Sequence, residues 1–323
     1  MNNPSTQQST IPSNTYNHHI ADDEVDIREL FAVIWQGKWI IAAVTILFAI
    51  ASVFYAINQP NIYKSEILLA PAEQEGSSGL AGLAGQFGGL ASLAGVNLGS
   101  GSSNKAQLAI EVLKSRKFIS GFVEKHEILP DLMAAKSWDM QENKVIYDNE
   151  LYDAENNKWL REVQAPYKPK PSMQEAYKEF IEVISTNTDK ETGMVEISAE
   201  HVSPYVAQQW VEWLVADINK TMKSRDVIEA KKSTDFLTKQ IQQTKVADIR
   251  SVLYKLVEEQ AKTIMFANVR DEYVFKTIDP ALVPEEKFKP SRALIVILGT
   301  LLGGILSVLC LLIKEFTNKK NKC

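Results

Sequence analysis

The sequence lacks several features that point to particular classes of protein. It has only two cysteines, Cys310 and Cys323, so residues 1–309 must fold without a disulfide. The formal net charge of −5 and the pI near 5.6 give no basic field that would favour a nucleic-acid partner. Glycine is absent between Gly193 and Gly299, so helices in that stretch can run unbroken.

Residue types that carry out catalysis are not grouped in the sequence. The adjacent pair His18-His19 has no third metal ligand nearby, and the other two histidines are isolated. A Gly-x-Ser-x-Gly nucleophile motif is missing, and acidic pairs such as Glu285-Glu286 indicate solvated charge. Residues 76–104 are rich in glycine but lack the Gly-Lys-Ser/Thr ending of a phosphate-binding loop. We therefore expect a protein that is not an enzyme and holds neither cofactor nor metal.

Charged residues are also missing from two long apolar runs. The first covers residues 39–57, and the second covers residues 293–313 between Arg292 and Lys314. Each is about 30 Å long as a helix, which matches the hydrocarbon core of a bilayer. A buried core helix is the alternative for either run, but two runs of spanning length seldom serve one soluble core. An acidic lead before the first run disfavours a cleaved signal peptide, so we expect two transmembrane helices.

Two spans place both ends of the chain on the same side of the membrane. The positive-inside rule mildly favours the cytoplasm for the ends, because Arg28, Lys38 and the lysines after the second run flank them. The predicted order is a cytoplasmic tail (1–38), a span (39–57), an external domain (58–292), a second span (293–313) and a second cytoplasmic tail (314–323).

The external domain is predicted to mix helices and strands. We expect helices over residues 106–128 and 171–185, strands over 62–69 and 272–278, and a hairpin over 184–199. The candidate core residues of the first helix are Leu108, Val112, Phe118, Phe122 and Val123. A second apolar stripe at helical spacing consists of Val206, Trp210, Trp213, Leu214 and Ile218. The expected fold class is α+β.

Ser203-Pro204 is a typical helix start, and helical patterning continues from there to about Phe266. If it is continuous, a helix of about 60 residues would be about 90 Å long. A helical hairpin broken near Ser233-Thr234-Asp235 is the alternative interpretation. In either case, part of this segment must project from the domain or pair with neighbours.

Two further segments outside the spans are rich in apolar residues. Residues 24–36 are amphipathic and are predicted to lie on the inner membrane surface. Residues 76–104 contain too much glycine for a stable isolated helix and too much leucine for an inert linker. They form either a flexible apolar loop or a segment that packs against neighbouring subunits or lipid headgroups.

Small residues line one face of each predicted membrane helix. They are Thr45, Ala49, Ser52 and Ala56 on the first, and Gly299, Gly303 and Ser307 on the second. Because small residues let helices approach closely in lipid, we expect these faces to pack together, within a protomer or between neighbours.

A proline-rich segment precedes the second span. It contains Pro280, Pro284 and Pro290, and it ends in Ser291-Arg292. Because proline fixes φ and disfavours helix, the segment should cross the membrane interface as a stiff extended strap.

Several of these features occur together in one known family. Trp35, Gly37 and Lys38 open the first span, Tyr63-Lys64-Ser65 follows it, and Pro290-Ser291-Arg292 leads into a Gly-x-x-x-Gly helix. Over residues 24–316 the chain resembles the Wzz-type chain-length determinants, the polysaccharide co-polymerase family of Gram-negative inner membranes. It departs from the simplest members in its Gly-Leu-Ala segment and its proline spacing. Since ten residues follow the second run, we expect no cytoplasmic tyrosine-kinase domain.

The resemblance implies a ring-shaped homo-oligomer in the bacterial inner membrane, with a polysaccharide polymerase and lipid-linked polysaccharide as partners. Each protomer would hold a membrane-proximal α/β domain and a long helix in the periplasm. The ring would set the chain length of O-antigen or a related surface polysaccharide without bond chemistry. The alternatives are an exopolysaccharide or capsule export subunit that works with a separate tyrosine kinase, and a membrane-bound glycosyl-modifying enzyme.

Overall fold

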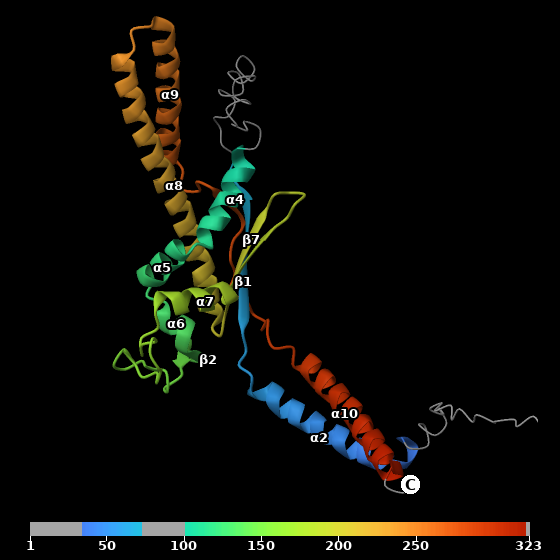
Figure 1. Cartoon of the computed structure of the whole chain (residues 1–323). Helices are drawn as coiled ribbons and strands as arrows, with labels where there is room; N and C mark the ends of the chain where they lie inside the picture. Colours follow the sequence, from blue (N-terminus) through green and yellow to red (C-terminus); the bar gives the residue numbers. More distant parts are fainter. Residues whose placement is uncertain (1–33, 73–100, 321–323) are drawn as a thin grey trace, which may run out of the picture. The chain divides into compact units, whose positions relative to one another are not determined.

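A computed structural model of the chain describes residues 34–72 and 101–320 (Figure 1). The chain forms two compact units, one of Met1–Ala56 with Arg292–Cys323 and one of Ile57–Ser291. We call them the helix-pair unit and the central unit. Most of the predicted segments 76–104 (residues 76–100) and 24–36 (residues 24–33), and the pair His18-His19, lie outside the described residues.

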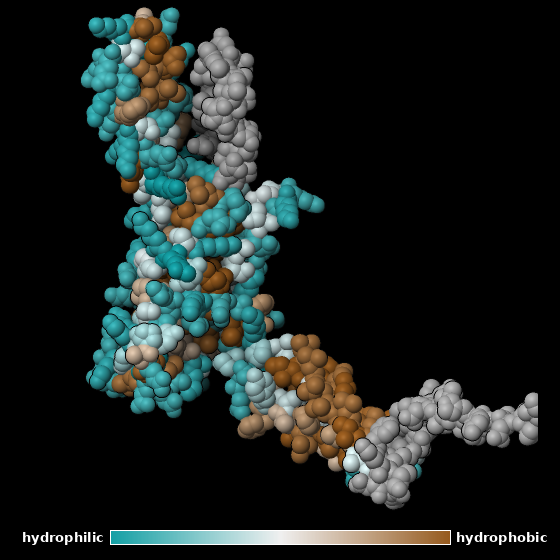
Figure 2. All heavy atoms as spheres, viewed as in Figure 1, coloured by the Kyte–Doolittle hydropathy of each residue, from teal (hydrophilic) through white to brown (hydrophobic). Residues whose placement is uncertain are grey.

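The helix-pair unit contains the two uncharged runs as helices α2 (Lys38–Asn58) and α10 (Arg292–Lys320). Their apolar stretches of 21 and 23 residues are long enough to cross a membrane. Only 6% and 11% of these stretches are buried, whereas a core helix of a soluble protein would be mostly buried. Figure 2 shows their apolar side chains at the surface. Both helices are therefore candidate membrane spans.

The central unit is built on a four-stranded antiparallel sheet in the order β6-β7-β1-β8. The strands are β1 (Tyr63–Pro71), β6 (Ile184–Thr188), β7 (Val195–His201) and β8 (Phe275–Asp279). The predicted hairpin forms β6 and β7. The predicted strand over 272–278 begins later, at Phe275, because the Asn219 side chain accepts the N–H groups of Val274 and Phe275 in place of a strand partner. The first and last strands are neighbours, so the unit begins and ends at adjacent positions in one sheet.

The helices before β6 are shorter than the sequence suggested. They are α4 (Gly101–Leu113), α5 (Arg116–Lys125), α6 (Leu129–Ala134) and α7 (Met173–Val183). The prediction of one helix over 106–128 is wrong. The Ser115 side chain accepts the Phe118 N–H and caps α5, so a second helix begins there. The predicted helix 171–185 starts later, at Met173, because Ser172 and Glu175 form a capping box.

The long helical segment is a hairpin of α8 (Pro204–Gln243) and α9 (Ala247–Val269). Ser203 caps α8 with Pro204 at its first position, as predicted. The prediction of one continuous helix is wrong. The hairpin alternative is confirmed, but the chain breaks at residues 244–246 instead of near Ser233-Thr234-Asp235. Thr234 lies within α8, where its hydroxyl donates to the Ala230 carbonyl one turn earlier and leaves the backbone of the helix unbroken.

Two small hairpins between α6 and α7 were not predicted. They are β2 (Ala135–Asp139) with β3 (Lys144–Tyr147), and β4 (Tyr152–Asp153) with β5 (Lys158–Trp159). In each turn an aspartate, Asp139 or Asp153, accepts two backbone N–H groups, and an asparagine adopts a φ of 50°. The shared pattern Asp-x-x-x-Asn-Lys is the local signal for these turns.

The core lies where the first half of α8 packs against the sheet, next to α5 and α7. Its largest fully buried side chains are Trp210, Phe122, Phe180 and Phe275. Leu214, Ile218, Phe118 and Val123 are buried as predicted, whereas Val112, Val206 and Trp213 are only partly buried. Leu108 was predicted to be core but is 43% exposed, so that prediction is wrong.

Candidate functional site

The two described histidines serve the fold rather than forming a catalytic group. His126 Nε2 lies 2.9 Å from Asp217 Oδ2, and the ring stacks on Trp213 at 4.1 Å. His201 is buried between the Asp131 carbonyl, 3.1 Å from Nε2, and the Ser203 N–H, 3.0 Å from Nδ1. Across residues 34–72 and 101–320, no three His, Cys, Asp or Glu side chains are placed to hold a metal ion.

Burial lowers the pKa of the His201 imidazole, because the charged form loses its hydration in the core. The hydrogen bonds also fix the neutral tautomer. Nδ1 accepts the Ser203 N–H, so Nε2 carries the proton that is donated to the Asp131 carbonyl. The ring therefore connects the end of β7 to the cap of α8.

The small-residue faces of α2 and α10 meet within one protomer. A Cβ added at Gly299 would lie 2.5 Å from the Cβ of Ser52. One added at Gly303 would lie equally close, at 2.5 Å, to the Cβ of Phe48. Real Cβ atoms do not approach so closely, so only glycine permits this spacing of the two helices.

The other predicted members of these faces lie along the same contact. Ala56 and Ser307 are buried, Thr45 and Ala49 are partly buried, and the Ser307 hydroxyl donates to the Gly304 carbonyl. Sequence reasoning missed Phe48, which is bulky yet faces Gly303. It also placed Gly37 in an inner-face motif, whereas an added Cβ there would overlap Leu311 of α10. Gly37 thus belongs to the helix contact as well.

Arg292 lies at the start of α10 and binds the end of α2. Its Nε donates to the Ala56 carbonyl at 3.0 Å. The last carbonyls of a helix have no partner within the helix, and a cationic donor stabilises them. Arg292 therefore closes the pair at one end, while Gly37 and Leu311 close it at the other.

The proline strap is attached to the start of β1. Residues 280–291, all of which the structure describes, include no helix and no named strand, as expected for Pro280, Pro284 and Pro290. Ile62 and Lys289 exchange backbone hydrogen bonds of 2.9 and 3.1 Å, and Ser65 donates its hydroxyl to the Leu282 carbonyl. The Lys289 ammonium also lies 2.6 Å from Glu200. The strap therefore leaves the central unit beside the strand that enters it.

Trp35 and Lys38, which were predicted to form an inner-face motif, lie one turn apart, with Lys38 as the first residue of α2 and Trp35 just before that helix. The Lys38 ammonium lies 4.9 Å from the centroid of the Trp35 ring, within range of a cation–π interaction. Both side chains are exposed, so they are available at the surface of the helix pair.

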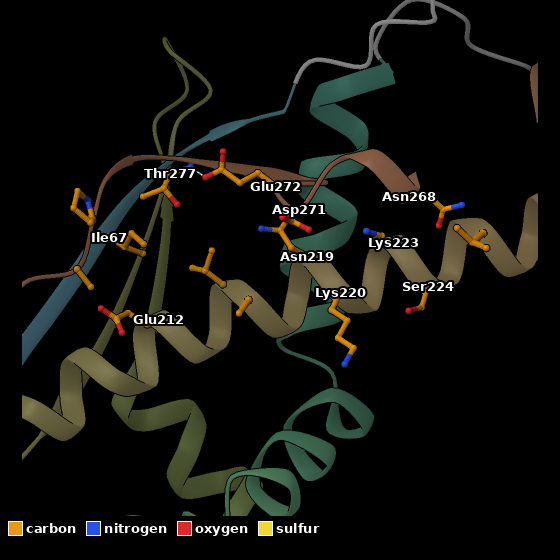
Figure 3. A pocket seen from close by; sticks show the side chains of 15 residues that line it. Ile67, Glu212, Asn219, Lys220, Lys223, Ser224, Asn268, Asp271, Glu272 and Thr277 are labelled. Carbon is orange, nitrogen blue, oxygen red and sulfur yellow. Dashed lines mark hydrogen bonds between the residues drawn. The ribbon is translucent and has the colours of Figure 1, made fainter. Parts of the chain in front are cut away.

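A groove of about 780 Å³ lies between α8 and the segment that leads into β8 (Figure 3). Ile67 and Val215 supply apolar lining, and Glu212, Lys220 and Asp271 supply charges of both signs. This mixture of charges does not favour one type of ion.

The fold uses much of the polar chemistry of this groove. Asn219 donates to the Phe275 carbonyl at 3.0 Å and accepts the N–H groups of Val274 and Phe275 at 2.8 and 2.9 Å. Lys223 donates to the Arg270 carbonyl. Glu272 accepts the Thr277 N–H, as Figure 3 shows. The sequence did not reveal this role of Asn219, although an asparagine one position after Ile218 in an apolar stripe is a local signal.

Comparison with known proteins identified two matching family models. Residues 23–126 match Wzz, described as "Chain length determinant protein". Residues 239–316, which span part of α8, all of α9, the strap and most of α10, match GNVR, described as "G-rich domain on putative tyrosine kinase". Among curated proteins, no similar sequence was found.

The fold was also compared with solved structures. One similar structure is a full-length bacterial polysaccharide co-polymerase, with 13% identity and a TM-score of 0.39, covering 92% of this chain and 99% of that one. Another is a fragment of WzzB, a polysaccharide co-polymerase from Salmonella Typhimurium. It has 10% identity and a TM-score of 0.29, covering 71% of this chain and 100% of that one.

Proposed function

Because residues 23–126 match the chain length determinant family model, we propose that this chain is a Wzz-type protein that regulates the chain length of a surface polysaccharide. It acts as an oligomeric scaffold in the bacterial inner membrane, beside the polymerase that builds O-antigen or a related glycan on a lipid carrier. It forms and breaks no glycosidic bond itself. The family match is the observation that carries this proposal.

The chemistry of the described residues supports a scaffold role. Glycosidic hydrolysis and transfer usually need a positioned pair of carboxyl groups with different environments. Several carboxylates in the central unit form ion pairs instead, such as Glu175 with Arg161 at 2.7 Å and Glu200 with Lys289 at 2.6 Å. The Arg161 guanidinium beside Glu175 holds the pKa of that carboxyl below its usual range. The Glu175 carboxylate therefore stays charged and is not poised to donate a proton.

The α8–α9 hairpin supports an oligomer. Ile249 and Val252 on α9 are 51% and 53% exposed, and Leu256 and Tyr254 are exposed beside them. Residues at spacings of three and four share one helical face, so Ile249, Val252 and Leu256 form an unpartnered apolar stripe. A neighbouring subunit in a ring would cover this stripe, which is the partner the proposal requires.

The proposal places both termini in the cytoplasm and the central unit in the periplasm. Reporter fusions test this placement. A reporter after Lys314 should be active only in its cytoplasmic form, and one inserted at Asn156-Asn157, in the turn between β4 and β5, only in its periplasmic form. An opposite result at either site would overturn the orientation.

Deleting the gene tests the function directly. If the protein regulates length, the polysaccharide is still made, but its size distribution broadens and the preferred length is lost. Gel electrophoresis of the surface polysaccharide measures this, with the deletion complemented by the unchanged chain as the control. An unaltered size distribution would end the proposal.

The second candidate function is a subunit for export of exopolysaccharide or capsule that works with a separate tyrosine kinase. The match over residues 239–316 favours it, because that family model is named for a domain found on such kinases. The same deletion separates the two candidates. Loss of all surface polymer would indicate export, whereas a broadened distribution indicates length control.

A further inference from the structure

A groove of about 420 Å³ runs along the start of α2, from Ile34 and Trp35 at one end to Thr45 and Ile46 at the other. Ala42 and Thr45 have small side chains and lie between the larger Ile41 and Ile46, so the helix surface is indented there. The groove lies wholly within the helix-pair unit. Its length from Lys38 to Thr45 is about 10 Å along the helix.

The two ends of this groove differ in polarity. Among the residues that line it, Lys38 alone is charged, and its ammonium lies 4.9 Å from the Trp35 ring centroid. Beyond Lys38 the lining is apolar except for the Thr45 hydroxyl. A ligand that matches this surface carries an anionic group at one end and a hydrocarbon chain at the other.

The position of the groove suits a lipid in one leaflet. The inference here rests on the proposed function, in which α2 and α10 span a membrane. Lys38 is the first residue of the apolar stretch of α2, so it lies where lysine and tryptophan concentrate, at the membrane–water interface. Leu311 of α10 packs at Gly37, and Lys314 follows one turn later, so this end of the helix pair presents two cations.

We propose that the groove binds one anionic glycerophospholipid per protomer. The phosphate lies at Lys38 beside the Trp35 ring, and an acyl chain lies over Ala42 and Thr45. A transmembrane helix of another protein is a poorer fit. Helices associate in lipid through small-residue faces, and most of that face of α2, at Ser52 and Ala56, is already covered by α10, whereas the groove shares only Thr45 with it.

Native mass spectrometry of the delipidated full-length oligomer in mild detergent tests this proposal. Phosphatidylglycerol is added in one series and phosphatidylcholine in another. The unchanged protein should hold one phosphatidylglycerol per protomer in preference to phosphatidylcholine. Lys38→Ala should lower the affinity for phosphatidylglycerol relative to phosphatidylcholine about fivefold, which is the effect of one lysine beside an anionic lipid headgroup. Lys38→Arg should restore the difference.

The groove itself is tested by Ala42→Leu, which fills the indentation and should reduce binding of both lipids. A matched control separates the site from general effects. Ala43→Leu adds the same volume at an exposed neighbouring position outside the groove lining, and it should leave the bound lipid count unchanged. Lys38→Ala alters only an exposed side chain, so it reports on the site even if Ala42→Leu fails to fold.

Equal binding of the two lipids by the unchanged protein would overturn the proposal, as would full binding by Lys38→Ala and Ala42→Leu. Binding of a polyprenyl pyrophosphate with no phosphatidylglycerol bound would overturn the choice of lipid. These results are distinct from a failure of the proposed function. If the proposed function is wrong, deleting the gene leaves the polysaccharide unaltered, but the purified protein still binds one phosphatidylglycerol per protomer.

Discussion

The two halves of α8 have opposite surroundings, although they belong to one helix. In the first half, Trp210, Leu214, Ile218 and Met222 are buried against the sheet, each at most 1% exposed. In the second half Ala230 is the only buried residue, and Ile228 and Phe236 are 55% and 62% exposed. Figure 2 shows apolar side chains at the surface of the hairpin among polar ones. The first half thus stabilises the fold, whereas the second half and α9 are available to partners.

The largest effect expected from this comparison is at Trp210. Trp210→Ala removes a fully buried ring and should lower the free energy of unfolding by about 3–5 kcal/mol. Phe236→Ala, on the second half of the same helix, should change it by less than about 1 kcal/mol in the isolated protomer. Denaturant unfolding of the full chain in detergent measures both. Equal losses would show that the two halves do not differ as described.

The next effect is at Asn219, where the first half of α8 holds the segment before β8. Asn219→Leu leaves the Val274 and Phe275 N–H groups without their partner and should cost about 2–3 kcal/mol. Asn268 lines the same groove but its side chain is exposed, so Asn268→Leu is the matched control. If both variants unfold at the same denaturant concentration as the unchanged protein, Asn219 does not tie these segments together.

A smaller effect is expected in the helix-pair unit, where glycine spacing sets the contact. Gly303→Ala forces a Cβ against Phe48 and should cost about 1–3 kcal/mol, whereas Gly304→Ala meets only the Thr45 hydroxyl at 3.9 Å. Thermal unfolding in detergent and the oligomer size in size-exclusion chromatography measure the difference. The helix contact would be contradicted if the Gly304 variant were the weaker of the two. Gly299→Leu combined with Gly303→Leu should then disturb assembly and length control together.

The smallest effect is the pH dependence of the central unit. Because burial lowers the pKa of His201, the unfolded chain binds a proton more readily than the folded chain. The contribution of His201 to stability is therefore present above the pKa of an unfolded histidine, about 6.5, and is lost as the pH falls below it. Unfolding at pH 7 and pH 5 measures this dependence. His201→Gln should reduce it, and an unchanged dependence would assign it to other groups.

Much of the architecture could be predicted because its causes are local. The length of the two uncharged runs predicted both candidate spans, Ser203-Pro204 predicted the start of α8, and the pattern over 184–199 predicted the hairpin of β6 and β7. The break of the long helix could not be located, since residues 244–246 contain neither glycine nor proline. Ser115 caps α5 inside an apolar pattern that continues across it, which concealed that boundary.

The candidate site was predicted in part. The faces with Ser52, Gly299 and Gly303 lie in contact, but their role in assembly stays a prediction. Phe48 opposite Gly303 and Leu311 opposite Gly37 could not be foreseen. Such contacts depend on the register between two helices more than two hundred residues apart, which helical spacing within each one does not determine.

The hairpin offers the most direct test of the central claim that the protein controls chain length through a projecting scaffold. Because α8 and α9 run side by side, seven residues are deleted from each between Thr234 and Glu259, so that the remaining faces stay within about 20° of register. Gel electrophoresis of the surface polysaccharide should then show polymer with a shifted preferred length, while the thermal unfolding of the central unit is nearly unchanged. A folded, assembled variant that gives the same preferred length as the unchanged protein would contradict the account.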